Sequence, residues 1–235
     1  MNPFDYHFIT FINQFARKSG FFDSVASEFV TNNILKGGIL SALLWFLWFS
    51  APVPDRTRVR QVLVATLMGA LLAMLISRVL VHELPFRPRP LYNKELHFVA
   101  PIADWRTNEI ASFTDLNSMP SDTATLVFAL VTGMLLVSWR IGLPALVYAV
   151  VFVCLPRVYG GVHNPTDLLA GAVLGTSCVL LATRPRLLQR LAVPVLVFGK
   201  RYPGLFYASL FFFTSQVSSM FDDVREFLSF FLLTH

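Results

Sequence analysis

Three short polar segments carry the residues whose types and spacing suit phosphate chemistry. They read "HELPFRPRP", "NSMPSDTATL" and "RVYGGVHNPTD", and each adjoins a long apolar run. Arginine guanidinium groups bind phosphate oxygens through forked hydrogen bonds, and a histidine can act as a nucleophile. The segments therefore predict a phosphoryl-transfer site. Its candidate residues are His82, Arg87, Arg89, Ser121, Asp122, Thr123, Arg157, His163 and Asp167.

The third segment contains the expected nucleophile. His163 can attack phosphorus through one ring nitrogen if a carboxylate holds the other, and Asp167 follows four residues later, about one helical turn away. Ser121 follows Pro120 at the expected start of a helix, where free backbone N–H groups favour an anion.

Each piece also has a purely structural interpretation. A single arginine at a membrane boundary commonly anchors to lipid headgroups. Ser121 alone is typical of a helix N-cap, and "NPTD" is typical of a helix start with Asn164 as the cap and Asp167 as its capping-box partner. The chemical interpretation depends on the segments occurring together.

Composition indicates what must position these residues. The chain is 55% hydrophobic and 14% charged, with a mean hydropathy of +0.60, against about 45–50% apolar and about 25% charged in soluble domains. We expect one all-α domain, residues 1–235, in the form of a polytopic membrane bundle with a core at 35–183 and accessory helices at 186–235.

Six apolar runs are long enough to cross a bilayer. They lie at about 35–53, 61–82, 122–138, 142–158, 165–183 and 204–221. At the N-terminus, Phe8, Phe11, Ile12 and Phe15 recur at helical spacing on a polar background, which predicts an interfacial helix rather than a short span. The segment 221–235 is expected to extend the last helix or to turn into the interface, and the aromatic-rich loop 91–119 is expected to form a lid or a headgroup contact.

Loop charges predict the orientation. Arg56, Arg58, Arg60, Arg140 and the basic stretch 184–201 should be cytoplasmic, because Lys and Arg resist translocation. The polar segments then lie on the outer face. These loops account for most of the net charge of +5, so no nucleic-acid partner is needed, and the cysteines, Cys154 and Cys178, lack metal-type spacing, so neither a metal nor a cofactor is predicted.

Taken together, the segments resemble the three-part signature of the type 2 phosphatidic acid phosphatase (PAP2) family. That signature is Lys, six residues, Arg-Pro; then Pro-Ser-Gly-His; then Ser-Arg, five residues, His, three residues, Asp. Arg89-Pro90, Pro120-Ser121 and the Arg157, His163, Asp167 spacing match it. The resemblance covers about residues 35–183.

The resemblance implies a metal-independent phosphatase that works through a phosphohistidine intermediate. His163 would be the nucleophile and Asp167 its partner, while Arg89, Ser121 and Arg157 would bind the phosphate. Arg87 matches no required position and is expected to play a supporting role.

The chain departs from the signature at four positions. His82 replaces the Lys, Asp122 the Gly, Thr123 the second His, and Pro156 the Ser before Arg157. The family's second His protonates the leaving oxygen, and a threonine hydroxyl is too weak an acid to do so. Asp122 and His82 are the candidate replacements, and His82 is alternatively a phosphate contact in place of the Lys.

The missing acid bears on the substrate. When a diphosphate is cleaved, the leaving group is a phosphate with a pKa near 6, so the reaction tolerates the loss of the general acid. When a phosphate monoester is cleaved, the leaving group is an alkoxide, which needs a proton. Pro-Ser-Asp also resembles the bacterial branch that acts on undecaprenyl diphosphate. We therefore expect a polyprenyl diphosphate phosphatase in the bacterial inner membrane with its site facing the periplasm. The alternatives are a phosphotransferase to another lipid or sugar, and a lipid-phosphate-binding subunit without activity. The oligomeric state stays open.

Overall fold

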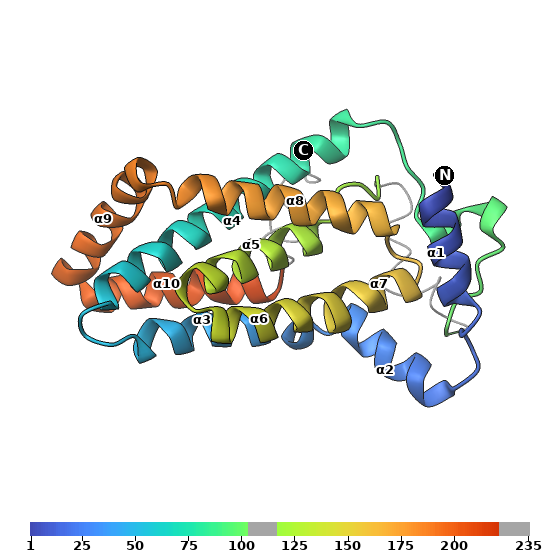
Figure 1. Cartoon of the computed structure of the whole chain (residues 1–235), viewed down its shortest axis with the longest axis horizontal. Coiled ribbons are helices and arrows are strands. Elements are labelled where there is room, and N and C mark those ends of the chain that lie inside the picture. The colour runs from blue at the N-terminus through green and yellow to red at the C-terminus, as the bar shows by residue number, and fades with distance from the viewer. Residues whose placement is uncertain (103–116, 221–235) are drawn as a thin grey trace, which may run out of the picture.

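Helices form all the regular secondary structure in the computed structural model, which describes residues 1–102 and 117–220 (Figure 1). The α-helices are α1 (Pro3–Asn13), α2 (Gly20–Thr31), α3 (Ile39–Ser50), α4 (Arg56–Glu83), α5 (Asp122–Val137), α6 (Trp139–Tyr148), α7 (Leu155–Tyr159), α8 (Pro165–Ala182), α9 (Pro185–Arg201) and α10 (Pro203–Ser218). Short 3₁₀ turns span Pro90–Tyr92 and Lys94–Leu96, and π-helical turns span Ile34–Gly38 and Ala149–Cys154. The all-helical fold class is confirmed for the described residues.

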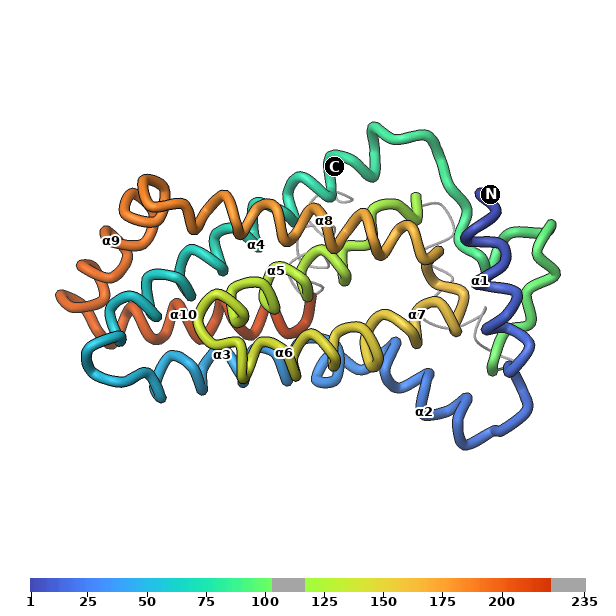
Figure 2. The backbone as a smooth tube through the Cα atoms, in the orientation of Figure 1, coloured from blue at the N-terminus to red at the C-terminus, as the bar shows by residue number. Residues whose placement is uncertain are grey.

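The centre of the bundle is α5, which packs against α4, α6 and α8. Its Leu126, Leu130 and Met134 are fully buried. Figures 1 and 2 show α4 and α8 running lengthwise beside it, with α9 at one end and α1 at the other. Because α8 begins at the α1 end and finishes at the α9 end, the loop before α8 and the loop after it lie at opposite ends of the molecule.

The described helices are compatible with a membrane protein. Three are long and apolar enough to cross a bilayer, Arg56–Glu83, Trp139–Tyr159 and Pro165–Ala182, and a fourth span results if α2 and the following helix, bent by 68°, count as one. The predicted count of six is not confirmed. The two remaining predicted spans lie in α5 and α10, which have 16 residues each, about 24 Å of helix against roughly 30 Å of hydrocarbon. Of these two short helices, α5 is the one apolar enough for a span.

Two glycines set the distance between α5 and α8. A Cβ at Gly175 would lie 2.0 Å from the Thr125 carbonyl oxygen, and one at Gly171 would lie 2.5 Å from the Ser121 carbonyl oxygen. Such small-xxx-small spacing lets helix backbones approach closely. The Ser121 N–H can then donate to the Asp167 carbonyl at 3.1 Å, so the second and third polar segments meet.

The N-terminal segment is helical as predicted, and α1 packs against α7 and α8. Its place in the membrane interface stays a prediction. Ile9 and Asp5 form its buried face, with exposed fractions of 1% and 0%, whereas Phe11 and Phe15 remain exposed. The predictions for residues 221–235, and for the lid aromatics Trp105 and Phe113, fall on positions outside the described residues.

Candidate active site

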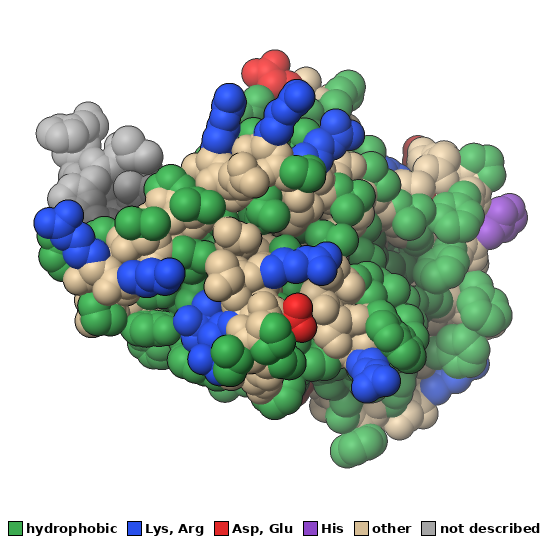
Figure 3. Space-filling view, turned by 60° about the vertical axis from the view of Figure 1, so that its left-hand side comes forward, with side chains coloured by type: hydrophobic (Ala, Val, Ile, Leu, Met, Phe, Trp, Pro, Cys, Tyr) green, Lys and Arg blue, Asp and Glu red, His purple; other side chains and the backbone are tan. Residues whose placement is uncertain are grey.

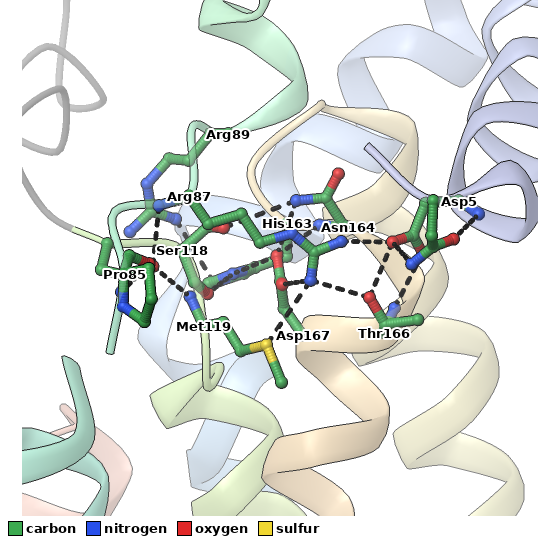
Figure 4. A network of polar contacts seen from close by, with 12 residues as sticks. Asp5, Pro85, Arg87, Arg89, Ser118, Met119, His163, Asn164, Thr166 and Asp167 are labelled. Atoms are coloured by element: carbon green, nitrogen blue, oxygen red, sulfur yellow. Dashed lines mark hydrogen bonds and ion pairs between the residues drawn. The ribbon is translucent and has the colours of Figure 1, made fainter. Parts of the chain in front are cut away.

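His163 lies in the loop between α7 and α8, and its ring is held by backbone (Figure 4). Its Nδ1 is 3.0 Å from the carbonyl oxygen of Ser118. A carbonyl can only accept, so Nδ1 carries the hydrogen and the neutral ring presents Nε2 as a free lone pair. The tautomer therefore leaves the nucleophilic nitrogen available.

Two buried guanidinium groups stand beside this nitrogen. Nη1 of Arg89 lies 3.5 Å from Nε2 of His163 and donates to the Val162 carbonyl at 2.7 Å. Arg157 is 4% exposed, and its Nη1 donates to the Val153 carbonyl at 3.3 Å. Backbone carbonyls thus fix Arg89 beside Nε2 and hold Arg157 near enough for its charge to act on the ring.

The electrostatic surroundings keep His163 neutral. Burial, followed by the positive charges of Arg89 and Arg157, holds the pKa of His163 well below its usual range, and the bond to Ser118 opposes this only in part. Burial also lowers the pKa of Arg89, although the negative charges of Asp167 and Asp122 raise it in part. The guanidinium still remains charged at any physiological pH. A neutral nucleophile beside fixed cations is suited to attack on an anionic phosphate.

Ser121 and Thr123 lie at the start of α5. Ser121 is the N-cap, and its Oγ accepts from the Ala124 N–H at 3.4 Å. The capping interpretation is therefore confirmed, while the hydroxyl hydrogen remains a donor. Thr123 Oγ1 accepts from Nη2 of Arg157 at 3.1 Å, so this hydroxyl helps to hold the arginine.

Asp167 is fully buried and does not bond directly to His163. Its Oδ2 accepts from the backbone and side-chain N–H groups of Asn164 at 2.7 and 2.9 Å, which is the capping box predicted as the alternative role. The distance to Nδ1 of His163 is 3.9 Å. The Asn164 amide also contacts the Ser118 hydroxyl at 3.4 Å. The Asp167 carboxylate therefore positions the His163 ring mainly by fixing the Asn164 backbone in the loop that carries His163.

Arg87 joins three segments. Its Nη1 donates to Thr166 at 2.8 Å and to Asp167 at 2.6 Å, and its Nη2 forms an ion pair with Asp5. Asp5 also accepts from the Thr166 backbone N–H at 3.0 Å and from the Thr166 hydroxyl at 2.7 Å. The guanidinium is thus bound between two carboxylates of its own chain, α1 on one side and α8 on the other (Figure 4).

The two candidate acids lie apart from His163. Asp122 accepts from the Ser77 hydroxyl at 2.6 Å and pairs with Nη2 of Arg78 at 2.5 Å. His82 is exposed on the last turn of α4. Among the described residues, the structure brings Arg87, Arg89, Ser121, Thr123, Arg157 and Asp167 into one cluster around His163, with Asp122 at its edge and His82 outside it.

Comparison with known proteins gives one match to a family model. The model of the PAP2 superfamily matches residues 86–189, a range that contains Arg87, Arg89 and all of the second and third segments but begins after His82. No curated protein and no solved structure matches the chain. The family match supports a phosphatase-type enzyme.

Two contributors to the site escaped the sequence analysis. Asp5 was not among the candidate site residues there, and its partner Arg87 is 82 residues away. Ser118 holds the His163 ring through its carbonyl, a group that every residue has, so the sequence gave no signal for this role. An acidic residue on the otherwise apolar side of α1 was the one available hint.

Proposed function

We propose that this protein is a membrane lipid phosphatase that removes the terminal phosphate of a polyprenyl diphosphate, of the undecaprenyl type. One observation carries the proposal: Nδ1 of His163 lies 3.0 Å from the Ser118 carbonyl, an arrangement that leaves Nε2 as the lone-pair nitrogen, 3.5 Å from Arg89. A histidine with only a structural role would not need an unprotonated Nε2 next to the buried guanidinium of Arg89.

The reaction would proceed in two steps. Nε2 attacks the terminal phosphorus, forming a P–N bond while the bridging P–O bond breaks, and the electron pair leaves with the lipid monophosphate. Water then attacks the phosphohistidine, breaks the P–N bond and releases inorganic phosphate and a proton. Nδ1 keeps its hydrogen throughout, because the Ser118 carbonyl accepts it at 3.0 Å.

Arg89 and Arg157 would stabilise the charge on the equatorial phosphoryl oxygens in both steps. Prepositioned donors of this kind need no reorganisation when the charge develops, and removing one typically costs about 10² to 10³ in rate. The Ser121 hydroxyl adds a neutral donor at the start of α5. Among the described residues, no cluster of His, Cys, Asp or Glu is placed to hold a metal ion, and the proposed chemistry uses none.

The surroundings of Thr123 favour a diphosphate over a monoester. The hydroxyl accepts from Arg157 and is not an acid, and Asp122 is paired with Arg78. The leaving group from a diphosphate lipid is a lipid monophosphate, which departs without protonation because its pKa is near 6. The alkoxide that leaves from a monoester needs a proton from an acid. The polyprenyl chain would lie against the apolar helices.

For the whole chain we propose one domain with six spans, the shorter helices α5 and α10 included. The basic loops between α3 and α4 and between α8 and α9 would face the cytoplasm of a bacterial inner membrane, and the His163 cluster would face the periplasm.

The substrate is tested by phosphate release from purified protein supplied with an isoprenoid diphosphate, an isoprenoid monophosphate or phosphatidic acid. Wild type should turn over the diphosphate fastest. Thr123→His should raise monoester turnover by about 10² and change diphosphate turnover much less. Thr123→Gln, which has no acid, is the matched control.

Other outcomes have distinct meanings. If neither wild type nor Thr123→His releases phosphate from any lipid, catalysis is contradicted and the binding-subunit alternative is favoured. The observation behind that alternative is that Thr123 stands where the family has its general-acid histidine. Release of label into an added lipid or sugar acceptor in place of water would favour the phosphotransferase.

A further inference from the structure

A second basic site lies at the other end of the bundle. A cavity of about 330 Å³ opens between the start of α4 and the helices α9 and α10. Arg56, Arg60 and Lys200 line it, and no carboxylate does so in the described part of the chain. It is therefore positively charged without an internal counter-ion.

Arg60 lacks one hydrogen-bond partner. Its guanidinium carbon lies 5.0 Å from the centre of the Trp48 ring, and its Nε is buried with no acceptor among the described residues. A buried N–H without an acceptor is costly. Arg60 also lines the cavity, so an anion there would meet the positive charge of its guanidinium group.

The helix itself adds to the positive potential. Arg56 is the first residue of α4, and the preceding Asp55 makes no side-chain cap hydrogen bond. Free N–H groups and the positive end of the helix dipole favour anions, and the cations here act in the same direction. Both terms attract a phosphate group.

The apolar walls indicate that the anion belongs to a lipid. Val193, Val197 and Phe206 also line the cavity, and Val197, Phe198 and Leu205 continue outward as exposed apolar surface, at 59%, 40% and 60%. A free phosphate gains nothing from such a surface, whereas acyl chains do. Figure 3 shows this end of the molecule, where Lys and Arg side chains gather among hydrophobic ones.

We propose that this cavity binds the phosphate of an anionic glycerophospholipid, with Arg56, Arg60 and Lys200 around the headgroup and the acyl chains along α9 and α10. Basic pockets between membrane helices are suited to such headgroups. The site is separate from the His163 cluster and does not depend on the proposed catalytic function.

The test is native mass spectrometry of the full-length protein in detergent, titrated with cardiolipin, phosphatidylglycerol or phosphatidylcholine. The anionic lipids should bind and phosphatidylcholine should not. Arg56→Gln and Lys200→Gln, both at exposed positions, should each weaken cardiolipin binding by about fivefold.

Arg58→Gln is the matched control. Arg58 lies in the same turn of α4 but lines a different cavity, beside Phe46 and Leu136. It should change binding by less than about twofold if the site is local, whereas diffuse attraction to the surface would weaken all three variants equally. Equal weakening, or equal binding of phosphatidylcholine, would overturn the proposal. Displacement of the lipid by inorganic phosphate at equal concentration would overturn the assignment to a lipid.

Discussion

The two ends of the bundle carry similar cations in opposite circumstances. At the α1 end, Arg87 is bound between two carboxylates, Asp5 and Asp167, and Arg157 donates to a backbone carbonyl. At the α9 end, Arg56 and Lys200 are exposed around a cavity that no carboxylate lines within the described residues. Buried cations with internal partners hold a geometry, whereas exposed ones without counter-ions attract anions from outside.

The largest expected effect of removing a cation from one end of the bundle is a loss of catalytic rate at the α1 end. Arg157→Gln removes a fixed charge from the proposed phosphate site and should lower kcat by about 10² to 10³. Arg58→Gln removes the same charge from the other end and should leave kcat unchanged. Steady-state phosphate release from a diphosphate lipid measures both. Equal loss in the two variants would mean that general surface charge, not local geometry, matters.

Removing an internal counter-ion is expected to cost stability. Asp5→Ala leaves the half-buried Arg87 with one buried carboxylate in place of two and should lower the free energy of unfolding by about 3 kcal/mol. Asp55→Ala, at the exposed opposite end, should change it by less than about 0.5 kcal/mol. Urea unfolding in a mild detergent checks this. Unchanged stability of Asp5→Ala would show that α1 is not anchored by this pair.

The close approach of α5 and α8 is expected to have a smaller effect. Gly171→Ala places a Cβ 2.5 Å from the Ser121 carbonyl oxygen and should cost about 1–3 kcal/mol by overpacking. The control is Gly204→Ala in α10, where a Cβ meets nothing within 4 Å. The same unfolding measurement should find Gly204→Ala neutral or slightly stabilising, since alanine favours helix. A stable Gly171→Ala protein would contradict the tight contact.

The smallest expected effect is on protonation. Burial and the neighbouring arginines lower the pKa of His163, so the folded ring stays neutral where an unfolded one, with a pKa of about 6.5, takes up a proton. Stability linked to this group is therefore present at neutral pH and falls as the pH drops below that value.

Histidine ¹⁵N NMR of the labelled protein measures this directly. The His163 ring should titrate below the value of about 6.5 that is usual for a histidine, and Arg157→Gln should move its midpoint upward by removing one of the two neighbouring positive charges. A wild-type midpoint at or above about 6.5 would contradict the burial argument.

The sequence was sufficient for part of this account. The clustering of His163, Arg89 and Arg157 could be predicted because their side chains recur at an informative spacing. Asp5 could not, because its role depends on a contact across 161 residues, to Thr166. The spacing in the sequence pointed to Asp167 as the partner of Nδ1, but this carboxylate lies 3.9 Å away. The direct partner is a backbone carbonyl, and a sequence pattern does not reveal a backbone contact. The spans were harder still, since apolar runs do not reveal where a helix ends.

The central claim is that Nε2 of His163 accepts the phosphoryl group. It is tested most directly by quenching the enzyme during turnover of a diphosphate lipid labelled at its terminal phosphorus, then locating the label by mass spectrometry. The account predicts phosphohistidine at position 163 in wild type, and neither label nor turnover in His163→Asn. Turnover that survives in His163→Asn, or label on another residue, would contradict it.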